Sequence, residues 1–487
     1  MKQNDKLNLT MLCDFYELTM ANGYFQCGYT DRITYFDVFF RRVPDGGGFA
    51  LAAGLDQIID YIRDLHFDEA DIEYLRSKAL FSEAFLDYLR SFRFSGDIWA
   101  VPEGTPVFPG EPLMTVRARA IEAQLIETYV LLELNHQSLI ATKASRICRA
   151  AQGRVVLEFG SRRAQGTDAA ITGARAAYIG GCAGTACTIS EQMYGVKAGG
   201  TMAHSWVQMF DSEYEAFKTY CEIYPTNATL LVDTYDSLRS GVPNAIRVFN
   251  EVLKPKGITR CGIRFDSGDM AYLTITARRM LDEAGWPDCT ITCSNALDEY
   301  LITDLIRQGA KINLFGVGER LITARSESVF GGVYKLTAVE DGAGNIIPKI
   351  KISENVAKIT NPGFKKVYRI YGPEGKCFAD YICLWDEKVD GGPLELFDPD
   401  ATWKGQTATN YTAVELLVPV FKAGELVYDR PSLTEIRARA DAQLETLWGE
   451  VKRFDNPHNY YVDLSQKLWD LKHELLRRKG RSEDEHR

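Results

Sequence analysis

The feature that most constrains the fold is an alternation of short apolar runs and longer helix-like stretches, which begins near residue 154. The apolar runs are RVVLEFG, VKAGGTMA, TLLVDTY, CGIRFDSG, CTITCSN and INLFGVG, and AYLTITARRMLDEAG after Asp269 is one of the helix-like stretches. Repeated βα units of this kind predict a parallel sheet. They favour an α/β barrel, in which polar residues gather at the carboxyl ends of the strands. A doubly wound sheet shares the local pattern and is the alternative.

The regions on either side of these units have a different character. The segments ITYFDVFFRRV and LAAGLDQIIDYIRDL indicate a strand and an amphipathic helix, and VPEGTPVFPGEPLMTV has the Pro and Gly spacing of short strands joined by turns. After Val333 the run VEDGAGNIIPKIKIS predicts a hairpin around 341–345. We predict an N-terminal α+β domain over 1–135, the barrel over 136–335, and a C-terminal extension over 336–487 that packs on both.

Charge and composition exclude several classes of protein. The 487 residues include 56 basic and 66 acidic ones, and a net charge of −10 disfavours binding to nucleic acid or to an anionic membrane. No run approaches the roughly 18 apolar residues of a membrane helix, and the start MKQNDKLNLT lacks the apolar core of a secretory signal. Eleven cysteines without a CxxC pair indicate reduced thiols. We therefore expect a soluble, cytoplasmic protein.

One histidine and two acidic motifs stand where strands are predicted to end. His204 lies in AGGTMAHSW, the only Gly-rich strand-to-loop context among six histidines, where it is either a reactive or a structural side chain. Asp266 and Asp269 in RFDSGD can hold Mg²⁺ or a ribose diol, and Ser267 and Gly268 between them allow a tight turn. Helix capping is the alternative for these carboxylates. The motif VDTYDS repeats the same arrangement, with the same alternative.

Arginines and glycines at other strand ends are candidates for anion binding. Arg162, Arg163 and Arg264 can each form two hydrogen bonds to a carboxylate or phosphate, or can be structural ion-pair partners of residues such as Glu158. The run GVG at 316–318 follows INLF and has a bare backbone that can approach a phosphate closely. No GxxxxGK[ST] motif and no suitably placed GxGxxG motif occurs, so any phosphate is held by another arrangement.

Seven motifs occur together in one order between about residue 9 and residue 370: DFYELTMANGY, EFGSRRAQG, AGGTMAHS, LLVDTYDS, GIRFDSGD, FGVG and GGVYKL. With these motifs the chain resembles the nicotinate phosphoribosyltransferases. The resemblance implies a type II phosphoribosyltransferase fold, in which an irregular, TIM-like α/β barrel is joined to an N-terminal α+β domain. It also implies a homodimer whose active sites lie near the subunit interface. It also implies the first step of NAD salvage, in which nicotinate and 5-phosphoribosyl-1-diphosphate form nicotinate mononucleotide and diphosphate at the expense of ATP. Mg²⁺ is the implied cofactor and ATP the co-substrate.

The resemblance also implies roles for particular residues. The catalytic positions are His204, which ATP would phosphorylate, and Asp266. The implied nicotinate-binding residues are Tyr16, which stacks on the pyridine ring, Arg162, Thr201 and Arg264. The implied phosphoribosyl diphosphate-binding residues are Thr360, Gly316, Gly318, Ser267 and Gly268. Many relatives have a small hydroxyl residue after FGVG, where this chain has Glu319 and Arg320. Either Glu319 points away from the phosphate or Arg320 neutralises it.

Three other functions are compatible with parts of the pattern. A nicotinamide phosphoribosyltransferase would need no clamp for a carboxylate, and the two candidate arginines favour the acid. A non-catalytic ligand-binding protein on the same fold would not need His204 or Asp266. A metal-dependent barrel lyase would need a His/carboxylate cluster, which the motifs do not provide. The sequence leaves open whether Lys349, Lys351 and Lys358 bind phosphate or solvate a β-surface.

Overall fold

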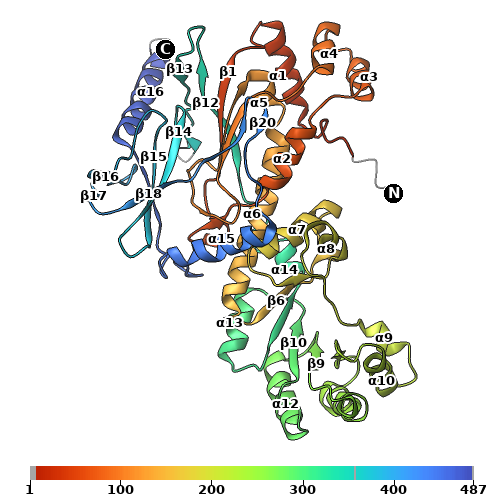
Figure 1. Ribbon diagram of the computed structural model, residues 1–487. Coiled ribbons are helices and arrows are strands. Elements are labelled where there is room, and N and C mark those ends of the chain that lie inside the picture. Colours follow the sequence, from red (N-terminus) through yellow and green to blue (C-terminus); the bar gives the residue numbers. More distant parts are fainter. Residues whose placement is uncertain (1–6, 356–357, 485–487) are drawn as a thin grey trace. The chain divides into compact units, whose positions relative to one another are not determined.

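The structure is a computed structural model that describes residues 7–355 and 358–484. The chain forms two compact units (Figure 1). One consists of Met1–Ser138 with Val329–Arg487, and the other of Leu139–Ser328. Helix α6 (Glu127–Ala150) begins in the first unit and ends in the second. The segment after residue 329 therefore belongs to the same compact unit as the N-terminal segment.

The unit Leu139–Ser328 contains a six-stranded parallel sheet. Its strands are β6 (Val155–Glu158), β7 (Gly184–Thr185), β8 (Thr229–Leu231), β9 (Gly262–Phe265), β10 (Thr290–Ser294) and β11 (Leu314–Val317). They lie in the order β7-β6-β11-β10-β9-β8, so the first strand of the unit pairs with the last. This is the order of a barrel opened between β7 and β8. The predicted parallel α/β architecture is confirmed, and closure of the barrel stays a prediction.

One expected strand of this sheet is absent from the described residues. The segment VKAGGTMA forms a loop that contributes only a single bridge, between Ala198 and Thr185, and β7 lies earlier in the chain. Two consecutive glycines, Gly199 and Gly200, have no side chains to pack against a neighbouring strand, which weakens a strand interior. The loop instead leads to His204 at the start of a short helix.

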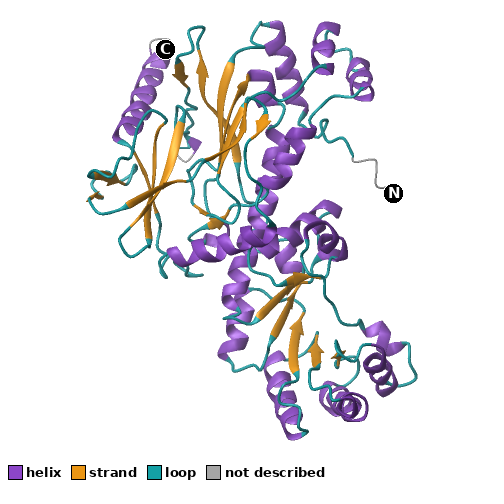
Figure 2. Cartoon of the chain, viewed as in Figure 1, coloured by secondary structure: helices purple, strands orange, loops and turns teal. Residues whose placement is uncertain are grey.

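Helices follow the strands of this unit, as Figure 2 shows. They are α7 (Thr167–Ile179), α8 (Thr188–Tyr194), α9 (His204–Gln208), α10 (Glu213–Ile223), α11 (Val242–Val248), α12 (Met270–Glu283), α13 (Glu299–Arg307) and α14 (Glu319–Ile322). Asp269 caps α12 by accepting a hydrogen bond from Tyr272 N at 3.0 Å, and Asp236 accepts two from the turn after β8. Capping, the alternative noted for the acidic motifs, therefore applies to their second carboxylates.

The other unit is built on an antiparallel seven-stranded sheet of order β13-β12-β1-β5-β3-β19-β20. Its strands are β1 (Ile33–Phe39), β3 (Asp97–Ala100), β5 (Met114–Arg119), β12 (Val333–Glu340), β13 (Ile346–Pro348), β19 (Val418–Lys422) and β20 (Glu425–Leu426). Strand β1 lies between β5 and β12, which explains why residues after 329 join the N-terminal unit. The antiparallel pairing of β12 with β13 confirms the predicted hairpin.

Helices and smaller sheets complete this unit. The helices are α1 (Phe15–Gln26), α2 (Leu55–Asp64), α3 (Glu69–Ser77), α4 (Glu83–Arg90), α5 (Ala120–Gln124), α15 (Leu433–Thr446) and α16 (Gln466–Asp484). The smaller sheets contain β2 (Ala50–Leu51), β4 (Pro106–Val107), β14 (Lys365–Tyr371), β15 (Cys377–Leu384), β16 (Leu394–Phe397), β17 (Gly405–Ala408), β18 (Thr412–Glu415) and β21 (Tyr461–Leu464). Helix α2 buries Leu55, Ile58, Ile59 and Ile62, whose helical spacing forms one apolar face in the core of the unit. Within the described ranges, no helix has the length and apolar composition needed to cross a membrane.

Candidate active site

Polar side chains from four segments meet at the carboxyl edge of the parallel sheet. Arg264 lies in β9, Asp266 follows that strand, and Ser294 is the last residue of β10. Thr201 comes from the loop before α9. Because the strands are parallel, their carboxyl ends lie at one edge, and residues 30 and 63 positions apart in the chain come into contact there.

Arg264 is the centre of this group. Its Nε donates to Ser294 Oγ at 2.8 Å, its Nη2 to Asp266 Oδ1 at 3.0 Å, and its Nη1 to Thr201 Oγ1 at 3.2 Å. The guanidinium also lies 5.7 Å from the centroid of the Phe159 ring, within the range of a cation–π contact. Two of the residues expected to bind nicotinate, Arg264 and Thr201, are therefore direct neighbours.

Asp266 is held as a carboxylate by its neighbours. Burial acts to raise its pKa, but the hydrogen bond from Ser294 and the positive charge of Arg264 outweigh burial, with a smaller contribution from His204, and the pKa lies below its ordinary value. The side chain of Asp266 is 30% exposed, so it remains accessible to a ligand. Its backbone N–H donates to Asp233 Oδ2 at 2.8 Å, which ties the turn after β9 to the residue that follows β8.

His204 begins helix α9 on the same side of the sheet. Its Nδ1 is 3.1 Å from Thr234 Oγ1, and its Nε2 is 3.9 Å from Asp233 Oδ1. The imidazole is 39% exposed while the side chain of Asp233 is 2% exposed, so the ring faces solvent and the carboxylate behind it is buried. Among the described residues Asp233 Oδ1 is buried without a hydrogen-bond partner. This geometry leaves His204 Nε2 available for reaction beside a fixed negative charge.

Steric packing and backbone conformation also account for the glycines assigned to phosphate binding. A Cβ added at Gly316 would lie 2.4 Å from Cδ2 of Phe159, and one at Gly318 would lie 3.2 Å from the Phe159 carbonyl oxygen. Gly268 has φ +90°, a conformation that side chains disfavour. Ser267 donates to Asp233 Oδ2 at 2.7 Å. These residues shape the edge of the sheet, and their proposed contact with phosphoribosyl diphosphate stays a prediction.

Arg162 and Arg163 do not contact Arg264 in the described structure. Arg162 and Arg163 lie in the short 3-10 turn Ser161–Arg163 after β6 and are exposed, and their side chains make no polar contact in the part of the chain that the structure describes. The alternative of an ion pair with Glu158 is therefore not observed. Glu158 instead accepts hydrogen bonds from Gly160 N and, at 2.6 Å, from Thr185 Oγ1, which fixes the start of the turn.

The charged residues after the GVG run have partners of their own. Glu319 forms an exposed ion pair with Arg325 at 3.3 Å, and Arg320 pairs with Asp298. Arg320 therefore does not neutralise Glu319. Of the two arrangements expected from the sequence, the structure supports a Glu319 carboxylate directed to another partner.

Two of the assigned residues belong to the other compact unit. Tyr16 lies on α1 and is 44% exposed, and burial together with the nearby Glu127 carboxylate raises the pKa of its phenol. Thr360 is buried, and its Oγ1 accepts a hydrogen bond from Lys351 N at 3.3 Å. Lys349, Lys351 and Lys358 are exposed, and their phosphate-binding role stays untested.

The sequence motifs did not identify Ser294 or Thr234 as functional residues. Ser294 is the polar residue that ends the run CTITCSN, and Thr234 lies inside VDTYDS, so position at a strand end was the available signal. Neither residue type is chemically distinctive, because buried serines and threonines most often satisfy the backbone. Only the contacts to Arg264 and His204 reveal them.

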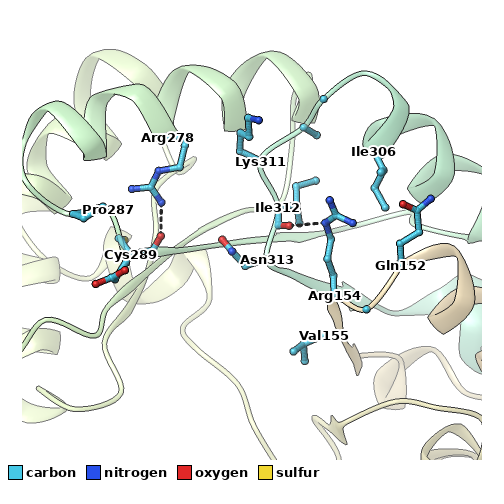
Figure 3. Close-up of a pocket in the computed structure, with 14 residues that line it drawn as sticks. Gln152, Arg154, Val155, Arg278, Pro287, Cys289, Ile306, Lys311, Ile312 and Asn313 are labelled. Carbon is cyan, nitrogen blue, oxygen red and sulfur yellow. Dashed lines mark hydrogen bonds between the residues drawn. The ribbon is translucent and has the colours of Figure 1, made fainter. Parts of the chain in front are cut away.

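A large cavity lies at the opposite edge of the parallel sheet (Figure 3). Its volume is about 920 Å³, and it is bordered by residues that precede β6, β10 and β11. Arg154 Nε donates to Ile312 O at 3.0 Å, and Arg278 donates to Cys289 O and Trp286 O at 2.6 Å. These arginines hold the starts of strands, and the cavity is remote in the sheet from the histidine and aspartate cluster.

The fold and the polar cluster around Arg264 at the carboxyl edge of the sheet together define an α/β protein of the type II phosphoribosyltransferase class. The crystal structure of human nicotinic acid phosphoribosyltransferase matches 96% of this chain and 100% of its own, with a TM-score of 0.83 and 30% identity. The structure of nicotinate-nucleotide pyrophosphorylase from Pyrococcus furiosus matches 92% of this chain and 99% of its own, with a TM-score of 0.70 at 23% identity, and shows the shared fold.

Sequence comparison specifies the family. The N-terminal and C-terminal domain models of nicotinate phosphoribosyltransferase match residues 11–135 and 364–472. Nicotinate phosphoribosyltransferase of Bacillus subtilis is 43% identical over 98% of this chain and 97% of its own length, and the human enzyme is 32% identical over 96% of each. The chain belongs to the nicotinate phosphoribosyltransferase family, which confirms the resemblance seen in its motifs.

Proposed function

We propose that the protein transfers the phosphoribosyl group of 5-phosphoribosyl-1-diphosphate to nicotinate and releases diphosphate, with ATP hydrolysis coupled to the transfer. The observation that carries the proposal is the Arg264 cluster, in which a guanidinium bound to Thr201 and Ser294 stands at the carboxyl edge of the parallel sheet. An arginine recognises a planar carboxylate through paired N–H donors, which an uncharged amide does not match as well. Nicotinate is therefore favoured over nicotinamide, in agreement with the names of the relatives.

The transfer itself is a problem of position and charge. As the bond between ribose C1 and the diphosphate oxygen breaks, positive charge develops on the ribose and the pyridine nitrogen forms the new C–N bond. Asp266, kept ionised by Ser294 and Arg264, is suited to stabilise that charge. The exposed ring of Tyr16 is suited to stack on the pyridine. The exposed Arg162 is the second candidate for the nicotinate carboxylate.

Mg²⁺ fits the oxygen donors at this edge. Asp233 Oδ1 is a buried carboxylate oxygen without a partner among the described residues, and Asp266 is the second carboxylate close by. Hard oxygen ligands are those that Mg²⁺ prefers, usually together with substrate phosphates. The ion would neutralise charge on the leaving diphosphate. We propose these two carboxylates as its protein contacts.

His204 is the proposed phosphoryl acceptor. Thr234 holds Nδ1, so Nε2 can attack the γ-phosphorus of ATP, with the P–O bond to ADP breaking as the N–P bond forms. Asp233, 3.9 Å from Nε2, stabilises the positive charge that the imidazole gains. Water then hydrolyses the phosphohistidine and releases phosphate. ATP is thus a co-substrate of the protein.

We propose that the protein is a homodimer and that it lies in the cytoplasm. Phe15, Tyr16 and Met20 on α1 expose large apolar surfaces, which commonly mark contacts between subunits. Sedimentation at micromolar concentration should give the mass of two 54.7 kDa chains, and the mass of one chain would contradict the proposal.

Two assays test the function. Purified protein with 5-phosphoribosyl-1-diphosphate and ATP should convert nicotinate at a rate well above that for nicotinamide, and equal rates would refute the acid preference. With γ-labelled ATP, acid-labile label should appear on the wild type and be absent from His204→Ala. His473→Ala is the matched control, because His473 stacks on Trp469 in α16 and bonds only to a backbone carbonyl in the described structure.

A further inference from the structure

Ser294 occupies a particular position in the Arg264 cluster. It is the last residue of β10 and only 3% exposed. Its hydroxyl oxygen is 2.8 Å from Arg264 Nε and is also hydrogen-bonded to Asp266 Oδ1. No other side chain in the described structure contacts both the arginine assigned to nicotinate and the aspartate assigned to catalysis through one atom.

The chemistry of the three groups fixes the direction of these hydrogen bonds. A guanidinium has only donors, so Ser294 Oγ accepts from Arg264 Nε. The single hydroxyl proton is then available for the Asp266 carboxylate, which is ionised and is a stronger acceptor than the Phe265 carbonyl at 3.4 Å. The hydroxyl therefore links a cation to an anion with one donor and one acceptor bond.

This arrangement restrains the guanidinium. Arg264 is bound at Nε by Ser294, at Nη2 by Asp266 and at Nη1 by Thr201. The first two contacts lie along one edge of the planar group and together resist rotation about the Cδ–Nε bond. Asp266 Oδ1 accepts from both Arg264 and Ser294, so loss of the serine leaves a single contact on that edge.

We propose that Ser294 is a positioning residue that orients the guanidinium of Arg264 for the carboxylate of nicotinate. The inference rests on the proposed function and deepens it. It assigns part of the preference for nicotinate over nicotinamide to a residue that would contact neither molecule. Removing the hydroxyl allows the guanidinium to rotate, and a rotated fork pairs less well with a planar carboxylate. Binding of the sugar diphosphate does not depend on that fork.

The central experiment compares Ser294→Ala with the wild type. We expect KM for nicotinate to rise about tenfold, which corresponds to about 1.4 kcal/mol, the scale of one charge-assisted hydrogen bond. KM for 5-phosphoribosyl-1-diphosphate should change less than twofold, and kcat should fall less than threefold. Ser294→Thr retains the hydroxyl and should restore most of the affinity for nicotinate.

Two further variants make the result interpretable. Ser190→Ala also removes a buried serine hydroxyl in this unit. Ser190 lies on α8 and donates to Ile171 O on α7 at 3.2 Å, so its replacement should leave both KM values unchanged. Ser294→Cys keeps the shape with a weaker hydrogen-bonding group and should give an intermediate KM, which also serves if the alanine variant does not fold. An equal rise in both KM values, or no rise for nicotinate, would overturn the positioning role.

Failure of the proposed function has a different signature. Wild-type protein that does not consume nicotinate would refute that function. Calorimetric titration of nicotinate into wild-type protein and Ser294→Ala then tests the positioning role directly. Weaker binding to the variant supports it, and equal binding or no binding to either protein overturns it.

Discussion

The replacement Gly316→Ala tests whether the Phe159 ring supports Arg264 as the structure shows. Gly316 pairs with Ser294 on one side and Leu157 on the other, so its backbone is held in the middle of the sheet. The new Cβ would lie 2.4 Å from Phe159 Cδ2 and 2.6 Å from Cε2, whereas carbon atoms in contact are about 3.5–4.0 Å apart. The ring must therefore move by about 1 Å, and with it the surface beneath Arg264.

Overpacking of this kind costs about 1–3 kcal/mol of the free energy of unfolding. For a unit of this size, about 2–4 °C of melting temperature is lost per kcal/mol, so scanning calorimetry should show a decrease of about 2–12 °C. Gly342→Ala is the control, because nothing lies within 4 Å of its added Cβ and its φ is not left-handed. This control should melt at the wild-type temperature or slightly above it.

A double-mutant cycle separates the clash from other effects of the methyl group. In a Phe159→Ala background the ring is gone, so adding Gly316→Ala should cost almost nothing further. The coupling between the two substitutions should then equal most of the cost of Gly316→Ala alone. The same cost in both backgrounds, or a melting temperature for Gly316→Ala equal to that of the control, would refute the proposed contact.

Three further predictions concern binding, pH dependence and buried charge. Arg264→Leu and Arg162→Leu should each raise KM for nicotinate more than tenfold beyond any change for the sugar diphosphate, and equal changes in steady-state kinetics would indicate a structural role. Burial raises the pKa of Glu17 to about 7, despite the hydrogen bonds from Thr128. The contribution of this shift to the free energy of unfolding is therefore fully present below the unfolded pKa near 4.5, and it is lost as the pH rises through 7. Urea unfolding of Glu17→Gln should therefore lose less stability than the wild type between pH 5 and pH 8, and identical losses would contradict this. Asp37→Asn leaves the buried Lys365 ammonium without its counter-charge at 2.8 Å and should lower the free energy of unfolding by about 3–5 kcal/mol, whereas Asp37→Leu with Lys365→Met should cost less; equal costs would argue against the buried pair.

Several parts of the fold and the site followed from local patterns. The parallel sheet was predictable because short apolar runs and helical segments alternate, and five of the six expected runs contain strands. The capping role of Asp269 was predictable as an alternative, because a carboxylate at the start of a helix satisfies free N–H groups. The run VKAGGTMA was misassigned because its apolar residues resemble a strand while its glycines favour a loop.

By itself, the sequence determined the α/β class and the family, and it selected His204, Asp266, Arg264 and Thr201 as candidate site residues, because these inferences depend on periodicity and on residue types in ordered motifs. The tertiary structure alone decided which of these residues touch. Strand pairing brings β8, β9 and β10 side by side, and only this pairing joins Ser294 to Arg264 and Asp266. It also decided that β12 lies beside β1, which places residues after 329 in the N-terminal unit. Contacts between distant segments depend on sheet order and register, and local sequence patterns do not encode these.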